Sequence, residues 1–444
     1  MAKLQPQEGT GAWRPAGPGD LQELAGRITA LLDAFGRCGA DPDGGYTRYL
    51  YSGAWQEAQC AVSREMDAAG LSVYYDEAGN LFGRLEGSSA EEGAVLTGSH
   101  IDTVRCGGLY DGAAGIAAAV AAIELLHRRC GQPRRTLEAV SLCEEEGSRF
   151  PLTFWGSGSI AGRYAPDAPP EAADRSGVTL AEAMKAAGFG PGTHRSARRT
   201  DIGAFVELHI EQGAVLEQER LDLGVVLGIV GQRRWTFTLR GEANHAGTTP
   251  MRLRRDALAG ACEMILEAER QACAYGEAMV ATAGSVSAAP GLSNVIAGQA
   301  VFTLDVRHPD AETLQSFCDE LYGIFEGIAA SRELEFAGEQ WMNVLPAPMD
   351  ARLCEAVEAA AKGLGLRSRR MYSGAGHDAQ VFSGSFPAAM LFVPSSKGLS
   401  HSPEEYTSPE QLARGAAALC NVLYTLAYEE EEKEKGDSQH ENVR

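Results

Sequence analysis

Residues 94–146 read AVLTGSHIDTVRCGGLYDGAAGIAAAVAAIELLHRRCGQPRRTLEAVSLCEEE. Residues 95–97 and 137–143 have the apolar composition of buried strands, and residues 112–129 between them predict a long helix. A strand, a helix and a second buried strand form the β-α-β unit of a mostly parallel sheet with helices on both faces. We therefore predict an α/β fold for this part of the chain.

The pattern changes after residue 224. From there to residue 342 the sequence predicts two helices and about four strands, enough for a compact α+β unit with one sheet and a helical face. The α/β pattern then resumes. We therefore predict a smaller domain, residues 225–342, inserted into a larger one made of residues 1–224 and 343–428. Residues 429–444 are strongly polar and predict a disordered tail.

Composition excludes several classes of function. The chain has 444 residues and a formal net charge of -21, and it offers no basic face for nucleic acid. No stretch is long and apolar enough to cross a membrane, and the first twenty residues contain no apolar run typical of a signal peptide. The ten cysteines include no CxxC pair. We expect reduced thiols and a cytoplasmic protein.

Histidine and carboxylate side chains follow several of the predicted strands. His100 comes after the strand at residues 95–97, and the acidic residues 144–146 directly follow the next buried strand. His209 and His401 stand in the same context. In open α/β sheets the carboxyl ends of the strands meet at one edge, so we expect these side chains to lie together. Mixed histidine and carboxylate ligands suit zinc, manganese or a similar divalent ion.

A hydrolytic site with two divalent ions needs one shared ligand, further ligands on each ion, and a base for the water between them. Asp111 suits the shared position, because one carboxylate can offer an oxygen to each ion. His100 and His209 would complete one ion site. Glu146 and His401 would complete the other. The sequence therefore predicts a two-metal hydrolase.

Glu145 precedes a predicted ligand and is free to take a proton from the water and give it to the leaving nitrogen. Asp102, two residues after a predicted histidine ligand, can orient that ring. Taken singly, each histidine could be an ordinary hydrogen-bonded residue, and residues 144–146 could be a solvated surface. Cys106 and Cys143 lie close to the predicted ligands in sequence; we expect small packed side chains there, with a metal role as the alternative.

Nine motifs occur in order between about residues 20 and 428: GSHIDTV, GGLYDGAAG, EEEGSRFP, ELHIEQG, NHAGTTPM, LSNVI, DVRHPD, SGAGHDAQ and GLSHSPEE. Together they resemble the amidase branch of the M20 metallopeptidase-like superfamily. That branch holds allantoate amidohydrolases, N-carbamoyl-L-amino-acid hydrolases, and ureidoglycolate and β-ureidopropionate amidohydrolases. The resemblance implies the ligands and base named above, and a smaller domain that forms a homodimer and acts as a lid.

The resemblance also implies roles for residues that bind the substrate. Gln212 resembles a residue that contacts the substrate, and His245 resembles one that crosses the dimer interface and stabilises the oxyanion. Asn294 and Arg307 resemble the pair that holds the substrate's carboxylate, for which a planar guanidinium is well suited. Gly376 lies in a glycine-rich turn that could bring backbone amides to the same carboxylate; a plain turn before a helix is the alternative.

His209 favours ureido-cleaving amidases, because peptidases and deacylases of the superfamily commonly have an acid at this place. The stretches that flank the motifs resemble those of bacterial allantoate amidohydrolases. We therefore expect hydrolysis of a ureido C–N bond in a small anionic substrate, allantoate, with two zinc or manganese ions per subunit. N-carbamoyl-L-amino acids, ureidoglycolate and, in a peptidase or N-acyl deacylase, acylated substrates are the alternatives. Lys397 departs from many relatives and adds a cation near His401.

Overall fold

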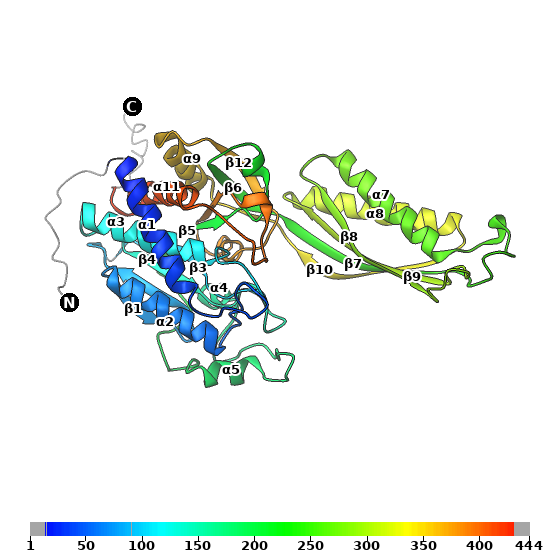
Figure 1. The fold of residues 1–444 in the computed structure, drawn as a ribbon, viewed down its shortest axis with the longest axis horizontal. Helices are drawn as coiled ribbons and strands as arrows, with labels where there is room; N and C mark the ends of the chain where they lie inside the picture. The colour runs from blue at the N-terminus through cyan, green and yellow to red at the C-terminus, as the bar shows by residue number, and fades with distance from the viewer. Residues whose placement is uncertain (1–13, 15, 90, 430–444) are drawn as a thin grey trace, which may run out of the picture. The chain divides into compact units, whose positions relative to one another are not determined.

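The computed structural model describes residue 14, residues 16–89 and residues 91–429. Residues 430–444 of the predicted tail therefore lie outside the described part of the chain. The chain forms two compact units (Figure 1). The larger unit contains the residues up to Val226, Met349–Arg370, and the residues from His377 onward. The smaller unit contains Leu227–Pro348 and Met371–Gly376.

The larger unit is built on a mixed sheet whose strands follow the order β1, β2, β4, β3, β5, β13, β6. Their bounds are β1 (Ser72–Tyr75), β2 (Leu81–Leu85), β3 (Ala94–His100), β4 (Leu137–Leu142), β5 (Ile202–Ile210), β6 (Leu223–Ile229) and β13 (Ala388–Val393). β6 also pairs with β12 (Ser368–Ser373) and with β11 (Ala347–Pro348). The four central strands β4, β3, β5 and β13 pair in parallel. Antiparallel pairs extend the sheet on both sides. The α/β prediction is confirmed, with the parallel pairs concentrated at the centre.

Helices surround this sheet. They are α1 (Pro18–Phe35), α2 (Gly53–Ala68), α3 (Ala113–Cys130), α4 (Trp155–Ala161), α5 (Leu180–Ala186), α6 (Val215–Gln218), α9 (Ala351–Gly363), α10 (Asp378–Phe382) and α11 (Pro409–Ala427), with a 3-10 turn η2 (Ser396–Gly398). The long helix expected between the first two buried strands is α3. Alanine favours helix formation, and its small side chain lets α3 pack closely against β3 and against α1 and α11. The start of α3 therefore lies at the carboxyl ends of the central strands.

The smaller unit has one antiparallel sheet of the order β10, β7, β9, β8. Its elements are β7 (Gly231–Arg240), η1 (Met251–Leu253), α7 (Ala257–Tyr275), β8 (Val280–Ala289), β9 (Gln299–His308), α8 (Ala311–Ser331) and β10 (Glu335–Val344). Every second residue of β7 is buried, including Trp235, Phe237 and Leu239, and these side chains form a core with Phe302 and Phe325. The helices α7 and α8 pack on the sheet. This is the expected α+β architecture of two helices and four strands.

Two general features bear on the sequence predictions. Among the described residues, none of the helices has both the length and the hydropathy that a membrane crossing requires. All ten cysteines are free thiols, of which Cys143 is buried and Cys106 is half-buried. The Cys143 thiol donates to the carbonyl of Ala78. Burial raises the pKa of this thiol well above its ordinary value, so Cys143 is a packed neutral side chain.

Candidate metal centre

Three predicted ligands meet at the carboxyl ends of β3 and β5. His100 is the last residue of β3, His209 lies near the end of β5, and Asp111 precedes α3. The Asp111 Oδ1 atom lies 3.5 Å from His100 Nε2 and 3.2 Å from His209 Nε2. All three side chains are buried, and one ligand atom from each lies within 4.8 Å of the others. Two imidazoles and a carboxylate at this spacing can hold one divalent ion.

A second group shares Asp111 with the first. His401 Nε2 lies 3.2 Å from Asp111 Oδ2 and 3.4 Å from Glu146 Oε1. Glu146 Oε1 is buried and accepts no hydrogen bond from the described residues, although a buried carboxylate oxygen normally has a partner. The two oxygens of Asp111 thus face two separate groups of ligands. This donor set fits a pair of divalent ions bridged by one carboxylate.

Backbone carbonyls orient the two buried imidazoles. His100 Nδ1 lies 3.0 Å from the carbonyl oxygen of Asp102, and His209 Nδ1 lies 2.9 Å from that of Ile210. Because each Nδ1 faces an acceptor, it carries a proton, and Nε2, which donates to Asp111 when the ring is protonated, is the atom that the neutral ring would offer to a metal ion. The Asp102 carboxylate has another partner: its Oδ2 accepts from the Glu146 N–H at 3.2 Å. Asp102 therefore touches two of the candidate ligands at once.

Local backbone geometry supports this arrangement. Gly112 has φ +63, and a Cβ at this position would overlap the His100 ring and its carbonyl. Only glycine lets α3 start this close to β3. His401 and Gln212 have φ of 54° and 57°, a region that non-glycine residues rarely occupy. Such residues concentrate at functional sites, because the surrounding structure must hold them in place.

The electrostatics separate the acids of the cluster. Burial acts to raise the pKa of Asp111, but hydrogen bonds from the three histidines outweigh it and hold this pKa well below its ordinary value. Burial raises the pKa of Glu146 to about 7, with a further contribution from the charge of Asp111. Burial also raises the pKa of Glu145 well above its ordinary value. The Glu145 Oε2 atom lies 4.0 Å from His100 Nε2, beside the first group.

Gln212 and Lys397, two other residues predicted to lie near the site, differ in their contacts with the candidate ligands. The Gln212 side-chain amide donates to Asp111 Oδ2 at 3.0 Å and to Ser400 Oγ at 3.1 Å, so Gln212 lies beside the candidate ligands. Lys397 has an exposed side chain, and its backbone N–H donates to Glu217.

The remaining predicted residues belong to the smaller unit. His245 Nδ1 accepts hydrogen bonds from the N–H groups of Gly247 and Thr248, at 3.0 and 3.2 Å. The adjacent residue Ala246 donates its N–H to the carbonyl of Asn294, so the loops that carry His245 and Asn294 lie side by side.

The Arg307 guanidinium donates to both oxygens of Asp305, at 2.9 and 3.0 Å, and to the carbonyl of Gly374. This contact ties Arg307 to the glycine-rich turn that contains Gly376.

Sequence reasoning missed several buried polar residues around the ligands. Glu207 lies two residues before His209 on the same face of β5 and accepts from Ser99 at 2.6 Å. Glu207, His209 and His377 form a further buried group of possible ligands. A charged residue inside an apolar strand was the available signal for Glu207. Glu405, four residues after His401, is also buried.

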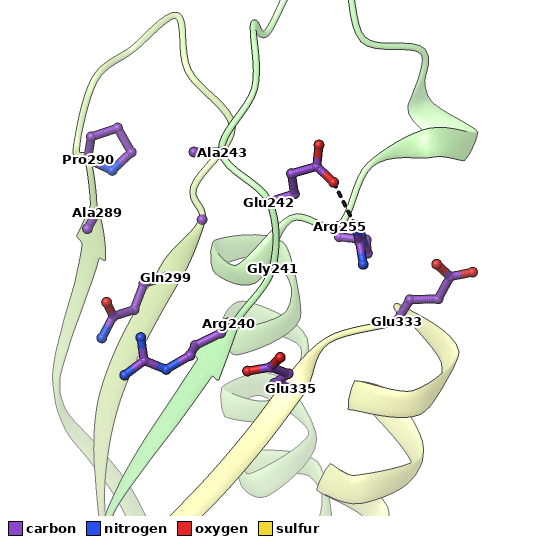
Figure 2. A pocket seen from close by; sticks show the side chains of 11 residues that line it. Arg240, Gly241, Glu242, Ala243, Arg255, Ala289, Pro290, Gln299, Glu333 and Glu335 are labelled. Carbon is purple, nitrogen blue, oxygen red and sulfur yellow. Dashed lines mark hydrogen bonds and ion pairs between the residues drawn. The ribbon is translucent and has the colours of Figure 1, made fainter.

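The smaller unit contains a pocket of about 550 Å³ at the ends of β7, β8 and β10 (Figure 2). Charged side chains line much of it, and Glu242 forms an ion pair with Arg255 at 2.7 Å. None of the predicted site residues lines this pocket. Part of its charge is neutralised by the Glu242–Arg255 ion pair, whereas the candidate metal centre is built around a buried carboxylate that faces two groups of ligands.

The fold agrees with comparisons to known proteins. A family model described as "Peptidase family M20/M25/M40" matches residues 96–425. The chain belongs to this family, and the predicted resemblance is confirmed.

Among curated proteins, the chain is 47% identical over 401 residues to the allantoate amidohydrolase of Bacillus subtilis (strain 168), covering 90% of this chain and 97% of that protein. It is 38% identical to the N-carbamoyl-L-amino-acid amidohydrolase of Paenarthrobacter aurescens, with 86% and 93% covered. Among solved structures, an amidase of the hydantoinase/carbamoylase family from Burkholderia multivorans matches with a TM-score of 0.87 and 34% identity, covering 91% of this chain and 98% of that one.

Proposed function

We propose that this chain is a metal-dependent amidohydrolase that cleaves the ureido C–N bond of a small anionic substrate, and that the substrate is allantoate. The observation that carries the chemistry is the position of Asp111, whose two oxygens face two separate groups of candidate ligands. The choice of allantoate is supported by the relatives, because identity to the allantoate amidohydrolase is higher than identity to the N-carbamoyl-L-amino-acid amidohydrolase.

The residues of the centre divide into ligands and a base. Two divalent ions, zinc or manganese, held by His100, His209 and Asp111 on one side and by Asp111, Glu146 and His401 on the other, would acidify a water and polarise the ureido carbonyl. Glu145 accepts a proton from the attacking water while the oxygen of the water adds to the ureido carbonyl carbon.

Glu145 then gives the proton to the leaving nitrogen. With allantoate, the amine product is ureidoglycine-type, and the carbamate released from the ureido carbon breaks down to ammonia and carbon dioxide. Gln212, which donates to Asp111 Oδ2, lies where it can also donate to the substrate. The reaction consumes one water and needs no redox partner.

Arg307 and Asn294 bind the substrate's carboxylate in this proposal. Asp305 and Gly374 occupy three of the five N–H donors of the Arg307 guanidinium and hold its plane, which leaves two donors for a carboxylate. Backbone amides near Gly376, in the turn that Arg307 contacts, would add to this grip. A guanidinium held in this way loses little conformational freedom when it binds a ligand.

His245 stabilises the oxyanion in this proposal. Since its Nδ1 accepts two backbone hydrogen bonds, the proton is on Nε2, which can donate to a negatively charged oxygen. We propose that it does so in the site of a partner subunit, with the smaller unit as dimerisation domain and lid. In the described chain β8 is an edge strand that pairs with β9 alone, and its Val280 and Val286 are 50% and 53% exposed. Exposed apolar residues on an unpaired edge favour pairing with a second copy.

The test measures ammonia release by the zinc- or manganese-loaded protein with allantoate, ureidoglycolate and N-carbamoyl-L-amino acids in parallel. Turnover of allantoate that is lost in Glu145→Gln, with the metal content unchanged, supports both the substrate and the base. Turnover of carbamoyl amino acids with allantoate inert keeps the chemistry and overturns the substrate. A deacylase would release no ammonia in this assay; release of the free amino acid from N-acyl amino acids, with the ureido substrates inert, would favour that class. A cytoplasmic location stays a prediction from the cysteine pattern.

A further inference from the structure

We propose that Glu405 is a positioning residue that holds the shared carboxylate of Asp111 between the two groups of candidate ligands. This inference rests on the proposed metal-dependent function. Glu405 is 5% exposed and lies in the loop after His401, far from Asp111 in the sequence. No part of the reaction described above uses it.

The contacts of Glu405 begin with the backbone that carries Asp111. Its Oε1 atom accepts the N–H groups of Tyr110 and Asp111, both at 2.9 Å. A buried carboxylate that accepts two backbone N–H groups forms strong, charge-assisted hydrogen bonds. Glu405 therefore fixes the segment from which the Asp111 side chain projects.

The second oxygen of Glu405 connects to the loop of His401. Ser400 Oγ donates to Glu405 Oε2 at 2.9 Å and lies 3.3 Å from Asp111 Oδ2. The hydroxyl has a single proton, and the shorter distance assigns it to Glu405. The Gln212 amide, at 3.1 Å from Ser400 Oγ and 3.0 Å from Asp111 Oδ2, closes the network. One carboxylate thus ties the shared ligand to the residue that precedes His401.

The packing around Glu405 is an independent sign that its position is fixed. A Cβ at Gly108 would overlap the Oε1 and Cδ atoms of the Glu405 carboxyl group. Glycine at this position gives the carboxylate room to reach the N–H groups of Tyr110 and Asp111. A Gly108→Ala variant would therefore displace Glu405 without removing it.

The geometry predicts which ion depends on Glu405. Through Ser400 and the Gln212 amide, the network reaches Oδ2 of Asp111, the oxygen that faces His401, whereas Oδ1 faces His100 and His209. Loss of Glu405 should weaken the ion held by Asp111, Glu146 and His401 more than the other ion. Changes in such supporting contacts typically reduce metal affinity about 10- to 100-fold.

The experiment titrates zinc into the metal-free full-length protein in competition with a chromophoric chelator. We expect two bound ions in the wild type. In Glu405→Ala and Gly108→Ala we expect about 10- to 100-fold weaker binding of one ion and a smaller change for the other. Glu405→Gln should recover part of the affinity, because its amide oxygen still accepts from both N–H groups. Glu404→Ala, at the exposed neighbouring position, serves as the matched control and should bind as the wild type does.

Thermal unfolding of the metal-free variants separates positioning from folding. If Glu405→Ala does not fold, Glu405→Gln and Ser400→Ala carry the test, and each should weaken one ion. Wild-type affinity for both ions in these variants would overturn the inference. So would an equal loss of both ions together with a lower unfolding temperature, which indicates a general role in the fold. Failure of the wild type to bind zinc or manganese would instead overturn the proposed function, and this inference with it.

Discussion

Asp111 Oδ2 lies 3.2 Å from His401 Nε2, while the other oxygen of the same carboxylate lies 3.2 Å from His209 Nε2. The two histidines come from β5 and from a loop near the carboxyl end of the larger unit. One short side chain therefore connects ligand groups that the sequence separates by almost two hundred residues.

Replacing Asp111 by asparagine should remove both ions, because an amide keeps the shape of the side chain but offers only one oxygen. We expect zinc affinity to fall by at least about 100-fold, beyond the usual effect of changing a supporting contact. Metal content after dialysis, measured by mass spectrometry, checks this. Retention of two ions per chain in Asp111→Asn would show that the carboxylate does not bridge them.

The stability of the metal-free protein should fall as the pH rises. The hydrogen bond to Asp111 raises the pKa of His401 from 6.5 to about 9, and burial raises the pKa of Glu146 from 4.5 to about 7. Folding raises the pKa of both groups. Each group's contribution to the free energy of unfolding is therefore complete below the pKa of the unfolded chain, and it is lost as the pH rises to the pKa of the folded protein. These windows are pH 4.5–7 for Glu146 and pH 6.5–9 for His401.

Metal ions take the place of these protons, so zinc should raise the unfolding temperature more at pH 9 than at pH 6. Thermal unfolding with zinc and with a chelator, repeated across this range, provides the measurement. A zinc effect that is independent of pH would argue against His401 and Glu146 as ligands.

Arg307→Lys should weaken substrate binding more than turnover of bound substrate. A lysine cannot donate to Asp305 and to a carboxylate in the same fork-like geometry, and the loss of a charge-assisted hydrogen bond amounts to about 1.5–3 kcal/mol. We expect KM to rise by about 10- to 100-fold. A substrate analogue with an amide in place of the carboxylate is the control. Equal losses for the acid and the amide would exclude carboxylate recognition by Arg307.

His245→Ala and Glu145→Gln should each be inactive as homodimers, yet partly active when mixed. In a mixed dimer, one site combines an intact Glu145 with an intact His245 from the partner. If subunits exchange at random, about a quarter of the wild-type activity should return. Co-expression with two affinity tags and an ammonia assay tests this. No recovery in an isolated mixed dimer would mean that His245 acts within its own subunit or not at all.

The parts of the fold that are set by local pattern could be predicted from the sequence. The strands around α3 are buried and mostly apolar, although Ser99, Glu138 and Glu207 are buried among them, and the strand-end positions of His100 and His209 follow from this pattern. The antiparallel edges of the sheet could not be predicted in this way, since a short apolar strand pairs equally well in either direction. Pairing of β2 with β4 is decided by tertiary contacts.

Residues that support the ligands were harder to find. Glu405 stands in the run Pro403-Glu404-Glu405, which is typical of a solvated loop, and its partners Tyr110 and Asp111 lie in another part of the chain. Ser400 carries no distinguishing pattern either. Such contacts depend on the folded geometry of two loops, and only their placement beside Asp111 identifies them.

In the proposed two-ion centre, the sharing of Asp111 would also link occupancy of the two ion positions thermodynamically. An ion at one position would order this shared ligand further, so a second ion would bind at a smaller entropy cost; mutual repulsion of the two charges would oppose this gain. By reciprocity, each ion changes the affinity of the other by the same factor. When the gain exceeds the repulsion, singly loaded molecules are scarce, and activity responds to the supply of metal as a threshold and not in proportion to it.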